Sequence, residues 1–219
     1  MSKSSLSHFV FRAVGLQIVL LGIWWTILYR PSIALLRLTA EIPLSLLLSN
    51  PLKSALEVDS SSGDWNFSVP VNAVVKDSTH SDGSVQVEAI DFTAPAENVA
   101  PFAIGWFVYL GLALSVLITR ENLRRALKGL LFQTAISALA VFSYAEINAR
   151  GTLAHIHRVP DPLSLWLLNF AYHIDYLVVP YATPFLVVLW THPQWWAKLT
   201  GIPQISSPVA AMRRPRSSR

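Results

Sequence analysis

Four long apolar stretches constrain this chain of 219 residues more than any other feature of its sequence. They cover residues 13–29, 98–119, 129–145 and 163–190. Only the last stretch is interrupted by ionisable side chains, those of His173 and Asp175. As helices, the shortest stretches are about 26 Å long, close to the thickness of the hydrocarbon core of a bilayer. The sequence therefore predicts four transmembrane helices.

The composition also favours lipid over water as the main solvent of the chain. Hydrophobic residues make up 53% of the sequence and charged residues 14%, whereas an ordinary soluble domain has about 25% charged residues. The absence of cysteine excludes disulfides, thiolate metal sites and cysteine nucleophiles. With so many apolar residues, the net charge of +4 indicates charged loops of a membrane protein and no nucleic-acid surface.

The distribution of basic residues orients the four helices. Eleven basic residues lie in the N-terminus, in the 120–128 loop and in the C-terminal tail: Lys3, Arg12, Arg120, Arg124, Arg125, Lys128, Lys198, Arg213, Arg214, Arg216 and Arg219. Glu121 is the single acidic residue in these segments. Because basic loops stay in the cytoplasm, we expect a multi-pass protein of the bacterial inner membrane with both termini cytoplasmic. Residues 31–97 and 148–162 then face outward.

The outward segment between the first two helices changes character along its length. Residues 31–56 are rich in Leu and Ile, but Arg37, Glu41 and Pro43 interrupt them, which predicts one or two short helices lying on the membrane surface. Apolar residues then occupy every second position from Trp65 to Val75, and a similar alternation follows in residues 84–92 with a change of phase near its end. This period predicts a β-hairpin.

These segments define the predicted architecture, a mainly α membrane protein with a small periplasmic α+β insertion between its first two transmembrane helices. Residues 1–30 form the cytoplasmic N-terminus and an uncleaved signal anchor, and residues 31–97 form the periplasmic region. Residues 98–190 form a three-helix membrane bundle with short loops, and residues 191–219 form a basic cytoplasmic tail.

No motif for enzymatic chemistry is present in the sequence. It has no phosphate-binding loop, no dinucleotide-binding glycine pattern, no zinc-protease motif and no hydrolase nucleophile elbow. We therefore expect a non-enzymatic protein without a cofactor.

Ionisable residues nevertheless gather near the predicted outer membrane face: Glu146, His155, His157, Arg158, His173 and Asp175. His155 and His157, two residues apart in a predicted extended loop, would point the same way and could bind a metal with His173. A proton path is a weaker interpretation, and ordinary pairing at the wet interface is the simplest one. Asp175 needs a partner from another helix or chain, and Arg150 and Arg158 are the nearest candidates in the sequence.

The last apolar stretch carries a family resemblance. The sequence Ala171-Tyr-His-Ile-Asp-Tyr-Leu-Val-Val-Pro180-Tyr-Ala-Thr-Pro184-Phe-Leu-Val-Val-Leu-Trp190 is similar to the final helix of the small membrane proteins associated with exosortase H. The order of an N-terminal anchor, a Leu-rich stretch, a β region and three helices also resembles that family. The resemblance implies an accessory role beside a membrane transpeptidase that handles sorting signals on exported proteins, without catalytic residues of its own.

Three functions follow as hypotheses. The first is an accessory subunit that binds an integral membrane partner, with an exosortase-type system as the candidate. The second is a periplasm-facing metal-binding protein or metal-dependent membrane enzyme built on His155, His157 and His173. The third is a supernumerary subunit of a respiratory or photosynthetic complex.

Overall fold

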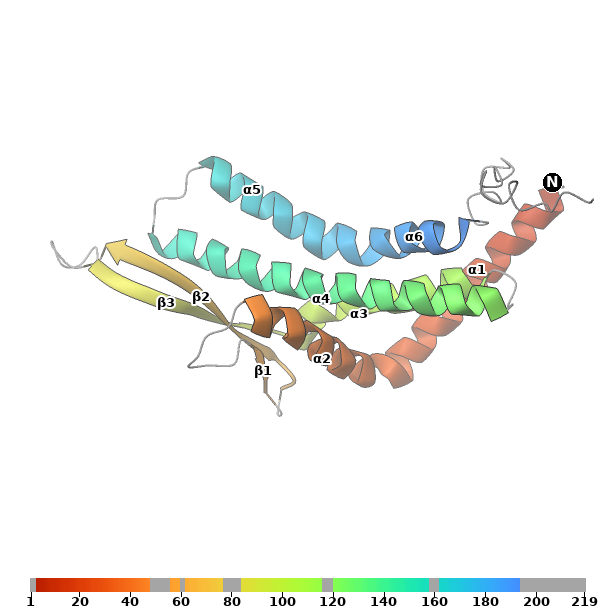
Figure 1. Cartoon of the computed structure of the whole chain (residues 1–219), viewed down its shortest axis with the longest axis horizontal. Helices are drawn as coiled ribbons and strands as arrows, with labels where there is room; N and C mark the ends of the chain where they lie inside the picture. Colours follow the sequence, from red (N-terminus) through yellow and green to blue (C-terminus); the bar gives the residue numbers. More distant parts are fainter. Residues whose placement is uncertain are drawn as a thin grey trace, which may run out of the picture.

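A computed structural model of the chain describes residues 3–47, 56–59, 62–76, 84–115, 120–157 and 162–193. Its helices are α1 (Lys3–Ile23), α2 (Tyr29–Leu47), α3 (Ala96–Leu114), α4 (Arg120–His157), α5 (Pro162–His173) and α6 (Val179–Thr191), with π-helical turns η1 (Trp24–Leu28) and η2 (Ile174–Val178). The strands are β1 (Leu56–Val58), β2 (Trp65–Lys76) and β3 (Ser84–Ala94). Figure 1 shows how these elements are arranged.

Four helical runs are long and apolar enough to cross a membrane. They are Val10–Leu46, Ala96–Leu114, Arg120–Leu153 and Trp166–Thr191. The prediction of a mainly helical chain with four long apolar helices is therefore confirmed. Their length and composition are those of a multi-pass membrane protein.

The helices run alongside one another, and the strands lie at one end of them (Figure 1). We call this the sheet end. The first residues of α1 and the last residues of α6 lie at the opposite end, which we call the termini end. α3 packs against α1, α4 and α6, and α2 packs against α4. The chain thus runs toward the sheet end through α1 and α2, back in α3, out again in α4 and back through α5 and α6 (Figure 1).

The first helix does not end near residue 30, as the charge pattern predicted. The chain stays helical from α1 to Leu47 and bends at η1, just before Pro31. Proline has no N–H and crowds the carbonyl four residues earlier, and a π turn accommodates this defect. The indole N–H of Trp24 donates a hydrogen bond to Ser32 Oγ at 2.8 Å across the bend. The predicted break is therefore a bend within a continuous helix.

α2 is held against the bundle by one of its faces. Leu36, Ala40 and Leu44 are completely buried. Residues four apart lie on one face of a helix, so these three form a stripe that packs with the core around α4. The prediction of a helix within residues 31–56 is confirmed for the part described as α2, which continues from α1 through η1, and its position on the membrane surface stays a prediction. Residues 48–55 lie outside the described part of the chain.

α4 is much longer than the predicted stretch of residues 129–145. It contains 38 residues and extends beyond that stretch at both ends. Each extension carries an ion pair between residues four apart: Glu121 with Arg125 at 3.1 Å, and Glu146 with Arg150 at 2.8 Å. Such pairs support a helix where it leaves an apolar environment.

The strands form an antiparallel sheet in the order β1-β2-β3. The predicted hairpin is confirmed in β2 and β3, which pair Phe67 with Phe92 and Val75 with Val85. The register shifts between Pro70 and Ala73. This irregularity accounts for the change of phase along β3, because an extra residue in one strand reverses which residues face the core. The short strand β1 pairs with β2 and was not predicted.

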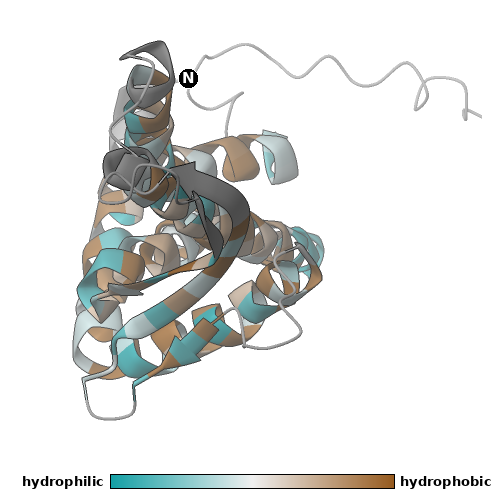
Figure 2. Ribbon diagram, turned by 90° about the vertical axis from the view of Figure 1, so that its left-hand side faces the viewer, coloured by the Kyte–Doolittle hydropathy of each residue, from teal (hydrophilic) through white to brown (hydrophobic). Residues whose placement is uncertain are grey.

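The sheet has an apolar side and a polar side, and Figure 2 shows hydrophilic and hydrophobic residues alternating along its described strands. Trp65, Phe67, Val69 and Ile90 are buried in the main core of the protein. Asn66, Asp91 and Thr93 are exposed. The apolar side therefore packs on the helices, as the period-two pattern predicted.

Candidate functional site

A series of aromatic rings fixes the sheet to the helix bundle. Phe67 of β2 lies with its ring centroid 5.1 Å from that of Phe92 and 6.3 Å from that of Tyr144 on α4. Tyr144 in turn lies 5.9 Å from Phe102 on α3 and 6.1 Å from Tyr172 on α5. Aromatic contacts of this kind add to the energy of apolar burial. The described base of the sheet therefore packs directly on the bundle through aromatic rings.

The opposite side of the sheet is polar and internally hydrogen-bonded. The Ser68 hydroxyl donates to Asp91 Oδ1 at 2.7 Å, and the Thr93 hydroxyl donates to Asn66 Oδ1 at 2.7 Å. Both bonds join residues that pair directly across β2 and β3. A pocket of about 340 Å³ lies among these residues and Glu57 of β1. On this polar sheet face Ser68 is buried, whereas Asn66, Asp91 and Thr93 are exposed beside the pocket.

β3 is an edge strand of the described sheet, because the strand order places β2 on one side of it and no described strand on the other. An open edge presents unpaired backbone N–H and C=O groups, which can accept a strand from another chain. Glu88, Asp91 and Thr93 are exposed along this strand. The edge and the polar sheet face together form a surface suited to protein contact.

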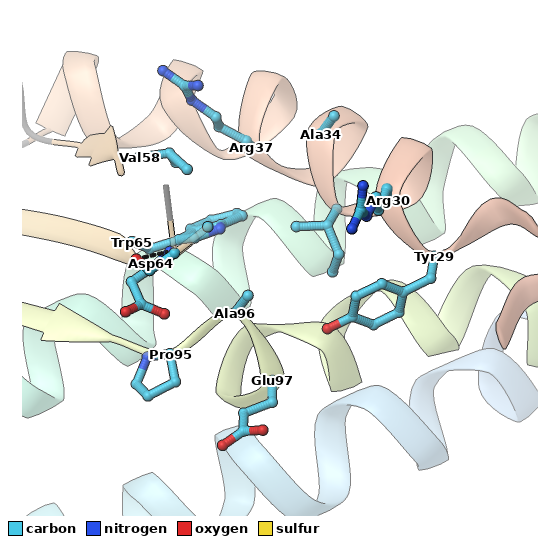
Figure 3. A pocket seen from close by; sticks show the side chains of 13 residues that line it. Tyr29, Arg30, Ala34, Arg37, Val58, Asp64, Trp65, Pro95, Ala96 and Glu97 are labelled. Carbon is cyan, nitrogen blue, oxygen red and sulfur yellow. Dashed lines mark hydrogen bonds between the residues drawn. The ribbon is translucent and has the colours of Figure 1, made fainter. Parts of the chain in front are cut away.

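A larger pocket, of about 840 Å³, lies between α2, the start of β2 and the start of α3. We call it the α2 pocket. Its lining residues are Tyr29, Arg30, Ile33, Ala34, Arg37, Val58, Ser62, Gly63, Asp64, Trp65, Pro95, Ala96 and Glu97. Figure 3 shows the arginines on α2 on one side and Asp64 and Glu97 on the other, with the Trp65 ring between them.

Backbone geometry places Asp64 and Trp65 at this pocket. Two backbone hydrogen bonds, from Asp59 N to Asp64 O at 2.9 Å and from Gly63 N to Asp59 O at 2.8 Å, close the connection between β1 and β2. Gly63 has a φ of +80°, which glycine adopts without the strain of a side chain. The Ser62 hydroxyl accepts a hydrogen bond from Asp64 N at 3.2 Å.

The residues singled out in the sequence near the predicted outer face do not form one site in the described part of the chain. Glu146 pairs with Arg150 on the same helix, so Arg150 is engaged away from Asp175. His155 and His157 belong to the last turn of α4, so the prediction that they lie in an extended loop is wrong. Arg158 lies outside the described residues.

His173 and Asp175 point to different sides, as their spacing predicts. His173 is exposed, and its Nδ1 lies 2.6 Å from the carbonyl oxygen of Asn169. Asp175, in η2, is buried, and its Oδ2 has no hydrogen-bond partner among the described residues. Pro180 follows η2 and lacks the N–H that would continue regular helix bonding, as Pro31 does after η1.

The described residues contain no group of three or more His, Asp or Glu side chains placed to hold a metal ion. The side chains of His155 and His157 lie outside that description, so the metal site that combines them with His173 stays a prediction.

His192 is a residue whose position the sequence did not reveal. It follows the last apolar stretch, where we expect a polar flank, but its side chain is completely buried at the termini end. Its Nδ1 lies 2.9 Å from Thr191 Oγ1 and its Nε2 lies 3.3 Å from the carbonyl oxygen of Asn122. Burial, with a smaller contribution from the charge of Arg125, lowers the pKa of this imidazole, although the bond to Asn122 opposes the shift.

No protein-family model, no curated protein and no solved structure matches this chain.

Proposed function

We propose that this protein is a non-enzymatic accessory subunit of the bacterial inner membrane that docks an integral membrane partner through its sheet. The observation that carries this proposal is the combination of a sheet fixed to the bundle by aromatic rings with an exposed polar face and an open β3 edge. A surface whose backbone is already held in place by packing and cross-strand hydrogen bonds has less conformational freedom to lose on binding, which favours its use as a docking platform.

The class of membrane partner is inferred from a sequence resemblance. The resemblance of the last helix to the exosortase H-associated proteins suggests a protein-sorting transpeptidase. A respiratory or photosynthetic complex is the competing assembly. The identity of the copurified protein separates these two classes.

The proposal requires the sheet end to face the periplasm. The distribution of Lys and Arg supports this orientation, because the basic first turns of α1 and of α4 lie at the termini end (Figure 1). Reporter fusions inserted at Ser81 are expected to report a periplasmic location, and fusions at Asn122 and after Met212 a cytoplasmic one. A cytoplasmic signal at Ser81 would reverse the arrangement and remove the sheet from the proposed partner's side.

Thr93→Arg tests the sheet as a docking surface. This substitution places a bulky cation on the exposed polar face, where it would hold a docked surface away, and we expect at least a tenfold loss of the copurified partner in mild detergent, equivalent to about 1.4 kcal/mol. The abundance of the protein itself should stay close to that of the wild type, since exposed substitutions usually change stability by less than about 0.5 kcal/mol.

Thr152→Arg is the matched control. Thr152 is also exposed and near the sheet end, but it lies on α4, where its hydroxyl donates to the carbonyl oxygen of Asn148 at 2.9 Å. The Thr152→Arg variant should copurify with the partner as the wild type does. Equal copurification by the two variants at equal abundance would show that the sheet does not dock the partner.

A further inference from the structure

The first turns of α4 carry a stripe of positive charge that is open to solvent. Arg120, Arg124 and Lys128 are exposed, and their spacing of four residues places them along one face of the helix. None of these three side chains forms an ion pair or a hydrogen bond with another described residue. Glu121, the single acidic residue nearby in the sequence, pairs with Arg125 at 3.1 Å. We call the three unpaired cations the basic stripe.

An apolar surface continues directly from the basic stripe. Leu131 follows Lys128 by three residues and Leu127 by four, so it lies on the same side of α4. Both leucines are more than half exposed. Phe132, four residues after Lys128, is also exposed, and its ring centroid lies 5.2 Å from that of Trp190 on α6. A ligand at the basic stripe would therefore meet a charged surface next to an apolar one.

The order of these groups along α4 places the basic stripe at a membrane surface. The helical run Arg120–Leu153 is long and apolar enough to cross a membrane, and its uncharged residues 129–145 begin immediately after the stripe. Because charged side chains are costly in the hydrocarbon core, the part of this run that lies in lipid begins after Lys128. Trp190 is exposed one residue before the end of the neighbouring run Trp166–Thr191, and tryptophan is enriched where lipid meets water.

The other side of α4 is packed against the bundle at this level. Ala126 is buried there, and its carbonyl oxygen accepts a hydrogen bond from the Tyr109 hydroxyl at 3.1 Å. The carbonyl oxygen of Asn122 lies 3.3 Å from Nε2 of the buried His192. A helix already held by such contacts has less conformational freedom to lose when a ligand binds its exposed side.

We propose that the basic stripe binds an anionic phospholipid whose headgroup has no ammonium, of the phosphatidylglycerol type. Arg124 and Lys128 lie about 6 Å apart along the helix axis, so their long side chains converge on one phosphate and donate hydrogen bonds to it. Arg120 contributes the third positive charge, and the acyl chains lie along Leu131 and Phe132. Ethanolamine and choline lipids have the same phosphate, but the stripe repels their own cationic group.

Lipid titration of the purified full-length protein in detergent tests this inference. Phosphatidylglycerol, phosphatidylethanolamine and phosphatidylcholine with identical acyl chains are compared, and the lipid-bound fraction is measured by native mass spectrometry. We expect at least tenfold tighter binding of phosphatidylglycerol, because each Lys or Arg near the headgroup favours an anionic lipid. Equal binding of the three lipids, or tighter binding of a zwitterionic one, would overturn the proposal.

Salt provides a second test on the same wild-type protein. The Debye length shortens from about 10 Å at about 0.1 M salt to about 3 Å at about 1 M salt, and the charges of the stripe are exposed. The preference for phosphatidylglycerol, measured by displacing bound lipid before transfer to the spectrometer, should therefore decrease with added salt. A preference that high salt leaves unchanged would contradict recognition by the basic stripe.

Variants of one arginine assign the site. Arg124→Gln removes the central cation and should weaken binding of phosphatidylglycerol about fivefold. Arg124→Lys keeps the charge and should bind like the wild type. Arg150→Gln is the control, because this exposed arginine also lies on α4 but pairs with Glu146 at 2.8 Å, far along the helix from the stripe. Equal binding by Arg124→Gln and Arg150→Gln would contradict the assignment.

A soluble competitor distinguishes the lipid from its headgroup alone. Glycerophosphoglycerol, added at the concentration of the lipid, should not displace phosphatidylglycerol, because it lacks the chains that contact Leu131 and Phe132. Full displacement would show that the stripe takes a soluble phosphodiester and not a lipid. The comparison of lipids on the wild-type protein decides the proposal even where a variant folds poorly. The basic stripe lies at the termini end (Figure 1), so this test does not depend on docking by the sheet.

Discussion

Phe67→Asp is expected to separate the sheet from the helix bundle. Phe67 is 1% exposed, and its ring contacts those of Trp65, Phe92 and Tyr144. Removing a buried phenylalanine costs about 3–5 kcal/mol, and the new carboxylate adds the cost of an unpaired buried charge. Limited proteolysis followed by fragment mapping should therefore show rapid cleavage within residues 56–94, while the long helices stay resistant.

Asn66→Asp introduces the same side chain one position earlier in β2. Asn66 is exposed, and its Oδ1 accepts a hydrogen bond from Thr93, a role that a carboxylate oxygen also fills. This control should resist protease like the wild type. Both variants introduce a carboxylate, but only Phe67→Asp places it on the apolar side and removes a buried ring, so equal resistance would mean that the apolar side of the sheet does not hold it to the bundle.

The strands could be predicted because the residues that face the helices recur at a fixed period. Trp65, Phe67 and Val69 occupy alternate positions and are buried together. The sequence shows that the apolar alternation in β3 changes phase near Ile90. The register shift between Pro70 and Ala73 that explains this change depends on how β2 pairs with β3, which the sequence alone does not show. β1 escaped prediction because three residues are too few to establish an alternation.

Helix length could not be predicted from the apolar stretches. Charged residues limit the part of a helix that lies in lipid, but a helix continues through water where its polar residues pair. Glu121 with Arg125 and Glu146 with Arg150 are such pairs, and they lie near or beyond the limits of the predicted stretch in α4. In α2, Arg37 and Glu41 suggested interruption, yet Leu36, Ala40 and Leu44 bury a different face of the same helix.

The α2 pocket could not be predicted because its groups are distant in the sequence. Arg37 on α2, Trp65 on β2 and Glu97 on α3 come together only after the first helical run bends and the sheet packs beneath it. The sequence signal that was present is the pair Arg30 and Arg37, which share a helical face within an otherwise apolar run. The predicted histidine cluster, by contrast, relied on a loop that is the end of α4.

Gly129→Ala is expected to destabilise the junction of α3, α4 and α6. A Cβ atom at Gly129 would overlap the hydroxyl and ring of Tyr109. Tyr109 is completely buried, and its hydroxyl donates to the carbonyl oxygen of Ala126 at 3.1 Å and lies 3.3 Å from Thr191 Oγ1. This ring cannot yield without losing these contacts, so overpacking should lower the free energy of unfolding by about 1–3 kcal/mol.

The same substitution elsewhere on α4 should have the opposite sign. A Cβ at Gly151 meets no atom within 4 Å, so Gly151→Ala gains the usual helix preference of alanine, about 0.5–1 kcal/mol. Thermal unfolding of the purified protein in detergent measures both effects, with the midpoint falling for Gly129→Ala and rising for Gly151→Ala. Adding Tyr109→Phe to Gly129→Ala removes the overlapping hydroxyl and should recover part of the loss. A rise in midpoint for both single variants would show that α3 and α4 do not approach each other at Gly129.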